Sequence, residues 1–90
     1  MKARTTRRFR DAFAVLPQAL QKQWRAAYRQ CVQTPAHPGL RFKLVHPEKP
    51  ILSVRVGVHY RALCVGLEKE IIWFWIGHHS EYDQLLVQMR

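Results

Sequence analysis

Acidic residues are scarce in this sequence of 90 residues, with six Asp or Glu against fifteen Lys or Arg. The imbalance belongs to the first half of the chain. Up to His46 ten basic residues face Asp11 alone, whereas from Pro47 onward five basic residues meet five acidic ones, so the first half carries the net charge of +9. Such a surface is expected to meet phosphates or an acidic protein, with a solvated surface that only maintains solubility as the alternative.

Cysteines and long apolar runs are also few. Cys31 and Cys64 both fall inside apolar patterns, which predicts reduced core residues of a cytoplasmic protein. No stretch approaches the roughly 20 apolar residues that a membrane-spanning helix needs, and no apolar signal segment is visible. We therefore expect a soluble cytoplasmic protein that does not contact the membrane. Its length suits a single compact domain over residues 1–90.

Metal-ligand motifs of the CxxC and HExxH types are absent from the sequence. His78 and His79 are adjacent, which favours side chains that face different ways. His46 and His59 are expected at strand ends or in loops, although both could extend a histidine-rich site. We therefore expect neither a metal ion nor a cofactor.

Helical periodicity marks the first third of the chain and its last residues. Apolar side chains recur at helical spacing from Thr6 to Leu16, with arginines on the remaining arc. Pro17 suits the first turn of a second helix, which should stop before the segment TPAHPG. Ser80, followed three residues later by Asp83, predicts the N-terminal cap of a short C-terminal helix.

An alternation with period two replaces the helical pattern after Gly39. The runs LRFKLVH, ILSVRVG, YRALCVG and IIWFWIG each predict a strand. The predicted fold is therefore an α+β domain, in which two N-terminal helices pack on a four-stranded antiparallel sheet and a short C-terminal helix follows.

The register of the two central runs follows from burial. A three-residue loop at residues 57–59 pairs apolar side chains with one another and places Arg55 directly opposite Arg61. Like charges in this position destabilise a sheet unless an anion or a carboxylate lies between them. Continued into the last run, the register sets Ala62 opposite Trp75 on the face that the helices cover.

Four segments in this order carry a family resemblance: LPQALQKQWRAAY, PAHPGLRFK, SVRVGVHYRAL and IIWFWIGHHSEYD. Over nearly the whole chain they resemble the RelE/ParE superfamily of toxins from bacterial toxin–antitoxin pairs. The resemblance implies two helices on an antiparallel sheet and an antitoxin whose segment wraps the toxin. The opening strand typical of that superfamily should be short or missing here. The resemblance also implies one of two activities, cutting of mRNA in the ribosome or poisoning of DNA gyrase.

The resemblance also implies site residues. Arg55 and Arg61 match basic positions on the sheet. His79 matches the histidine of an IGxHxEYD ending, and Tyr82 matches its aromatic partner. His78 stands where that ending more often has a small polar residue. The turn at the end of the last strand is expected to hold the histidines and the tyrosine over the sheet face that bears the arginines.

Cleavage of RNA without metal needs a base for the 2′-OH, an acid for the leaving 5′ oxygen, and cations for the charge of the phosphorane. His79 or His78 suits the proton steps, because imidazole titrates near neutrality. Arg55 and Arg61 could hold the phosphate. Tyr82 could orient the base or stack against a nucleobase. Taken with what the resemblance implies, these residues predict a metal-independent, ribosome-dependent mRNA endonuclease that is neutralised by an acidic antitoxin.

Other readings remain open at this point. The protein could inhibit gyrase, which requires a contact surface but no acid or base, or it could be an inactive module that only binds an antitoxin. Arg55 could pair with a carboxylate such as Asp83, Tyr82 could anchor the core, and either histidine could merely satisfy a strand end. The further candidates for contacts with RNA phosphates are Arg41, Lys43, Arg25 and Arg29.

Overall fold

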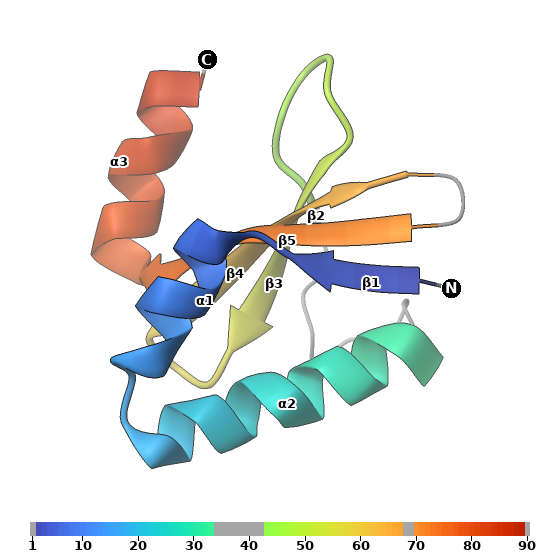
Figure 1. Ribbon diagram of the computed structural model, residues 1–90. Coiled ribbons are helices and arrows are strands. Elements are labelled where there is room, and N and C mark those ends of the chain that lie inside the picture. Colours follow the sequence, from blue (N-terminus) through green and yellow to red (C-terminus); the bar gives the residue numbers. More distant parts are fainter. Residues whose placement is uncertain (1, 34–42, 68–69, 90) are drawn as a thin grey trace.

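The computed structural model describes residues 2–33, 43–67 and 70–89 (Figure 1). In chain order, these residues form the elements β1 (Lys2–Thr5), α1 (Arg7–Ala14), α2 (Gln18–Gln33), β2 (Lys43–Leu44), β3 (Ile51–Val56), β4 (Tyr60–Gly66), β5 (Glu70–His78) and α3 (His79–Met89).

The sheet has five strands in the order β1-β5-β4-β3-β2, and it is mixed rather than antiparallel. β1 runs parallel to β5, with Ala3 opposite Ile71 and Thr5 opposite Trp73. The prediction of four antiparallel strands is therefore wrong in two respects. The sheet has a fifth strand, β1, and that strand runs parallel to its neighbour. A four-residue strand is too short to show a clear alternation, and its partner lies at the other end of the sequence.

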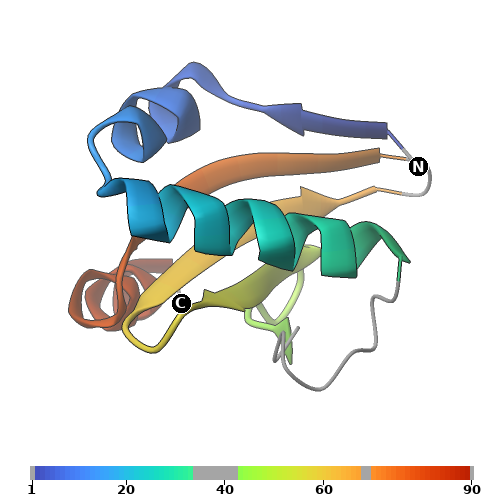
Figure 2. The same ribbon diagram turned by 90° about the horizontal axis from the view of Figure 1, so that it is seen from below.

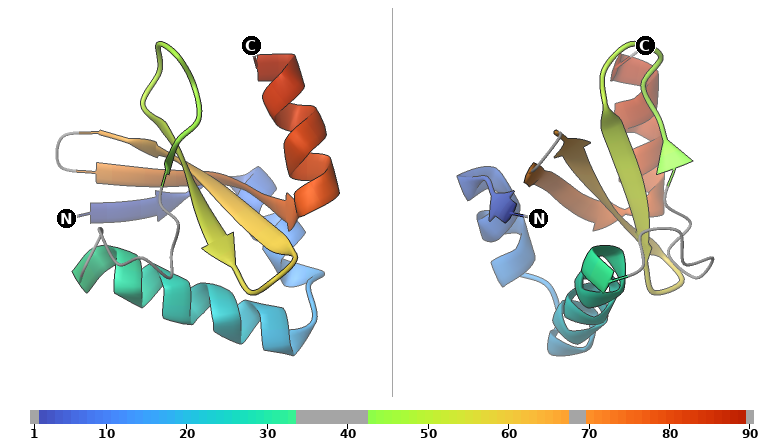
Figure 3. Two further views of the ribbon diagram at one scale, coloured as in Figure 1. Left: turned by 180° about the vertical axis from the view of Figure 1, so that it is seen from behind. Right: turned by 90° about the vertical axis from the view of Figure 1, so that its right-hand side faces the viewer.

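The helices lie on two sides of the sheet. α1 and α2 cover one face (Figure 2). On this face Phe9, Val54, Val56 and Trp73 form a buried core. α3 packs on the other side (Figure 3), where a second buried cluster includes Tyr82. The α+β class and the two helices on one face are thus as predicted. In the described part of the chain, no helix is both long enough and apolar enough to cross a bilayer.

The helix boundaries follow local signals. Thr6 caps α1, because its Oγ1 accepts a hydrogen bond from the backbone N–H of Phe9 at 3.1 Å. α2 begins at Gln18, so Pro17 directly precedes the helix instead of lying in its first turn, and its carbonyl oxygen accepts the N–H of Gln21 at 3.1 Å. Cys64 is fully buried in the core, whereas the side chain of Cys31 lies outside the described part of the structure.

The β3–β4 hairpin has the predicted register. Val56 lies opposite Tyr60, and Arg55 lies opposite Arg61. Gly57 opens the connecting turn with a φ of 64°, in the left-handed region that glycine adopts without steric cost. The two arginines therefore lie side by side on neighbouring strands.

A bulge changes the register of β4 with β5. Cys64 lies opposite Trp73 as predicted, but the register shifts at Leu63, so that Leu63 and not Ala62 faces Trp75. One extra residue in a strand reverses the face of every side chain that follows. The indole of Trp75 consequently lies on the α3 side of the sheet, and its predicted place under α1 and α2 is wrong.

Candidate functional site

Arg61 of β4 holds its guanidinium against an aromatic ring. Its Cζ lies 6.0 Å from the centroid of the Tyr82 ring, which α3 supplies and which is 6% exposed. Trp75 lies beside that ring at 6.4 Å between centroids. Gly77, opposite Arg61, leaves room for this indole, since an added Cβ would lie 2.7 Å from Cζ2 of Trp75.

The Nη1 atom of Arg61 is buried and has no hydrogen-bond partner among the described residues. Buried polar atoms in folded proteins are nearly always paired, and a guanidinium prefers carboxylate or phosphate oxygens. An unpaired, buried guanidinium nitrogen therefore indicates a place where an anion can bind.

Arg55 of β3 adds a second positive charge beside Arg61. Its Nε donates a hydrogen bond to the carbonyl oxygen of Gly57 at 2.9 Å, which bends the side chain back toward the hairpin turn. Within the described ranges, no carboxylate lies within 4.0 Å of either arginine, and Asp83 is exposed. The alternative in which Asp83 neutralises Arg55 is therefore not formed.

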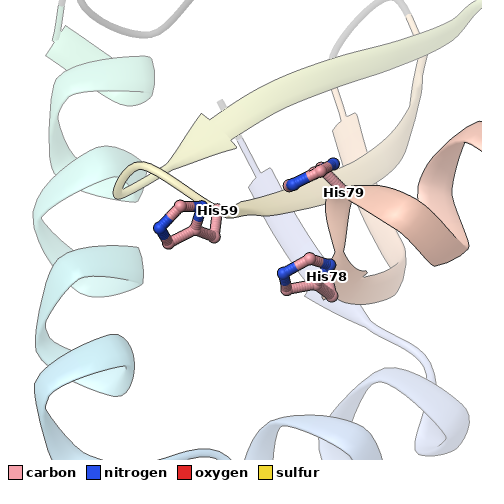
Figure 4. A group of neighbouring side chains, drawn as sticks. All are labelled: His59, His78 and His79. Carbon is pink, nitrogen blue, oxygen red and sulfur yellow. The ribbon is translucent and has the colours of Figure 1, made fainter.

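Three histidines meet where the sheet ends (Figure 4). His59 comes from the β3–β4 turn, His78 is the last residue of β5, and His79 is the first residue of α3. One ring nitrogen from each lies within 4.8 Å of the other two. His78 and His79 were expected to face different ways, yet their ring centroids are 4.3 Å apart. Strand alternation ends between these two residues, because the helix starts there without a linker.

Backbone contacts hold this histidine cluster, defined as His59, His78 and His79. The N–H of His79 donates to the carbonyl oxygen of His59 at 2.8 Å, and His78 lies opposite Tyr60 in the sheet. The Nδ1 atom of His78 accepts the N–H of Ser80 at 3.2 Å and lies 3.0 Å from its Oγ. The ring of His78 thus caps α3, and the predicted cap at Ser80 is wrong.

The candidate catalytic residues fall into two groups on opposite sides of the sheet. Successive residues of a strand point to opposite faces, so Tyr60 and Arg61 diverge. The ring of His78 lies edge-on to Tyr60, at 5.6 Å between centroids, and hence on the side of α1 and α2. The expectation that His78 lies over the sheet face of the arginines is therefore wrong. His79 stands three residues before Tyr82 in α3, a spacing at which side chains are neighbours on a helix surface, so it is the histidine that shares an element with the ring against Arg61.

The predicted contacts with RNA phosphates are dispersed. Arg25 and Arg29 are exposed on α2, which covers the face opposite Arg61, and Cζ of Arg25 lies 5.4 Å from the centroid of the Phe13 ring. Lys43 is exposed in β2, at the edge of the sheet. Arg41 lies outside the described residues.

Comparison with known proteins identifies the family. A family model described as the ParE-like toxin domain matches residues 18–84. The chain belongs to the ParE-like toxin domain family. The resemblance to RelE/ParE superfamily toxins is thereby confirmed, and with it the prediction that this protein is a toxin of the RelE/ParE type.

Solved structures with the same fold include two toxins. A chain from the RelB–RelE antitoxin–toxin complex of Methanococcus jannaschii is 20% identical, with a TM-score of 0.67 over 89% of this chain and 95% of that chain. A copper-bound mutant toxin from Helicobacter pylori is 15% identical, with a TM-score of 0.63 over 90% of this chain and 97% of that chain. These similarities show the fold. No curated protein matches this ParE-like toxin domain.

An apolar hollow of about 500 Å³ lies on the ParE-like toxin domain, on the sheet face that α1 and α2 leave open. Ile51, Val65 and Phe74 line it, and Leu67 and Lys49 lie at its border. The hollow was not predicted from the sequence. The apolar character of both faces of the last strand was the signal that could have indicated it.

Proposed function

We propose that this toxin is a metal-independent endoribonuclease that cuts mRNA in the ribosome and thereby arrests translation in the cytoplasm. The observation that carries the proposal is the buried, unpaired Nη1 atom of Arg61, next to the equally unneutralised Arg55. Two cations on neighbouring strands suit a phosphate that gains negative charge in the transition state. Binding of the scissile phosphate would also remove the repulsion between the two arginines.

His79 is the proposed acid or base. It begins the helix that presents Tyr82 to Arg61, so a phosphate held by the arginine lies close to the first turn of α3. His79 is exposed, so its ring is accessible to a bound RNA. His78, whose Nδ1 caps the helix, supports the position of that turn and is the second candidate for a proton step.

One experiment tests the activity. The toxin is induced in cells, the 5′ ends of mRNA are mapped, and purified toxin is added to a gyrase supercoiling assay. Cuts within translated codons that leave 5′-hydroxyl ends support the proposal. His79→Ala should lower cleavage on the order of 10²-fold or more, and Arg61→Met should abolish it. Arg8→Met, which alters an exposed arginine of α1, serves as the matched control.

Inhibition of DNA gyrase is the second candidate, because the matching family model is ParE-like. This activity needs a contact surface and no proton transfer. Supercoiling blocked by the purified toxin, with mRNA intact and His79→Ala still toxic, would replace the nuclease proposal by this one.

We also propose that an acidic antitoxin neutralises the toxin. The RelE chain with the same fold comes from a complex with its antitoxin RelB. In the present chain, the apolar hollow and the net charge of +9 suit the amphipathic segment of an acidic protein that folds on binding.

A charged side chain at the border of the hollow tests this partner. Leu67 is 47% exposed, so Leu67→Lys should leave the fold intact and weaken antitoxin binding. Val15→Lys, at an 82% exposed position after α1, is the matched control. Equal antitoxin affinity of the two variants in a titration would exclude the hollow as the binding site.

A further inference from the structure

The histidine cluster has the composition and the spacing of a metal site. One nitrogen from each ring lies within 4.8 Å of the other two. Nitrogens bound to a tetrahedral ion at about 2.0–2.1 Å lie roughly 3.3–3.4 Å apart. His59 and His79 are exposed side chains and can rotate to close this difference, while the backbone stays in place.

The backbone around the cluster is organised before any ion arrives. The hydrogen bond from the N–H of His79 to the carbonyl of His59, at 2.8 Å, joins the hairpin turn to the start of α3. The Tyr60–His78 pair fixes the end of β5 against the same turn. A backbone hydrogen bond and the strand pairing beside it therefore hold the turn that carries His59 against the β5–α3 junction that carries His78 and His79.

Ser80 determines which nitrogen of His78 is available. Because Nδ1 lies 3.0 Å from Oγ of Ser80 and 3.2 Å from its N, Nε2 is the nitrogen left for an ion. An ion at Nε2 requires the proton to sit on Nδ1, so Nδ1 gives up the hydrogen bond that it accepts from the N–H of Ser80 and donates one to Oγ of Ser80 instead. Hydrogen bonds of this kind orient ligating histidines and raise their basicity.

We propose that His59, His78 and His79 bind one late first-row transition-metal ion, namely Zn²⁺, Ni²⁺ or Cu²⁺, and leave at least one coordination position open. Imidazole nitrogens suit these ions, whereas Mg²⁺ and Ca²⁺ require oxygen ligands, which the cluster does not supply. The bound ion clips the β3–β4 turn to α3.

The metal site and the proposed nuclease activity share His78 and His79. The two proposals can nevertheless be tested independently of each other. If the toxin is the proposed nuclease, a bound ion occupies the imidazoles that are needed for proton transfer. Metal binding then inhibits cleavage. Metal binding itself involves neither the arginines nor RNA. Arg61→Met should thus leave metal affinity unchanged even though it abolishes cleavage.

Calorimetric titration of the untagged, full-length toxin with ZnCl₂ and NiCl₂ tests the proposal, with MgCl₂ as the control ion. We expect one ion per chain for Zn²⁺ and Ni²⁺ and no binding of Mg²⁺. His59→Gln, His79→Gln and His78→Asn should each lower the affinity at least tenfold, since loss of an outer hydrogen bond alone costs 10–100-fold. Asparagine at position 78 retains a helix cap, so folding is preserved.

His46→Asn is the matched control, because it removes a histidine outside the cluster. The Nδ1 of His46 accepts the N–H groups of Glu48 and Lys49, both at 3.0 Å, and an asparagine oxygen can accept the same bonds. This variant should bind Zn²⁺ as tightly as the unmodified toxin. A His59→Gln affinity within twofold of the original, or an equal loss in His46→Asn, would overturn the site.

Discussion

Replacement of Arg61 by methionine should stabilise the toxin domain and remove its response to anions. The native guanidinium has a buried nitrogen without a partner among the described residues, and it lies directly opposite Arg55. A buried, unsatisfied polar group costs about 1–3 kcal/mol. A like-charge pair across two strands costs about 0.2–1 kcal/mol more.

The losses in this variant are smaller than the gains. Methionine keeps an apolar stem of similar length against Tyr82 and gives up the cation–π contact at 6.0 Å, worth about 1 kcal/mol at a partly buried site. The free energy of unfolding should therefore rise by about 1 kcal/mol, which corresponds to a Tm increase of about 4–8 °C in a domain of this size. Arg61→Ala also loses the stem, at about 0.8 kcal/mol for each buried CH₂, so its stability should stay close to that of the unmodified toxin.

Thermal unfolding with and without inorganic phosphate measures both effects. Phosphate should raise the Tm of the unmodified toxin and of Arg8→Met by more than that of Arg61→Met, because only the first two proteins retain the unpaired guanidinium. A loss of more than about 2 kcal/mol in Arg61→Met would mean that the guanidinium has a native partner. An equal phosphate response in all three proteins would remove the anion site from the proposed mechanism.

Three further changes probe the support of the site. Gly57→Ala should cost about 1–2 kcal/mol in urea unfolding, because the φ of 64° is unfavourable for alanine and its Cβ would meet Oε1 of Gln23. Gly57→Asn should cost less, and equal losses would contradict the importance of the left-handed backbone. Thr6→Ala should cost about 1 kcal/mol by loss of the hydrogen bond to the N–H of Phe9, and Thr6→Ser should restore it in the same assay. Tyr82→Phe should change the unfolding free energy by less than about 1 kcal/mol and preserve toxicity in growth assays, since the ring rather than the hydroxyl contacts the arginine. A folded but harmless Tyr82→Phe protein would assign a proton step to the hydroxyl.

Local patterns were sufficient for the helices and for one hairpin. The spacing of apolar side chains located α1 and α2, because a helix buries one stripe of its own residues. The alternation in β3 and β4 fixed their register, including the Arg55–Arg61 pair, since a slip of one residue would have placed charged side chains in the core. The order of the quoted segments also identified the family.

Distant contacts decided the remainder of the sheet. β1 forms through parallel pairing with β5, at the opposite end of the chain, and four residues carry no pattern that names such a partner. The bulge at Leu63 is equally invisible in the sequence, yet it moves Trp75 to the face that carries Tyr82. Pairing across the sheet is selected by the packing of whole layers, to which each short strand contributes only a part.

The histidine cluster depends on the same bulge. The predicted register would have set Gly77 opposite Tyr60, whereas the shifted register places His78 there and brings it to the turn that carries His59. The sequence specified which imidazoles and guanidinium groups exist and that they lie near strand ends, because alternation and turn residues are local properties. Only the tertiary structure separates the arginines from the histidine cluster, through the bulge and the direct passage of β5 into α3. The packing of side chains between distant segments selects both of these features.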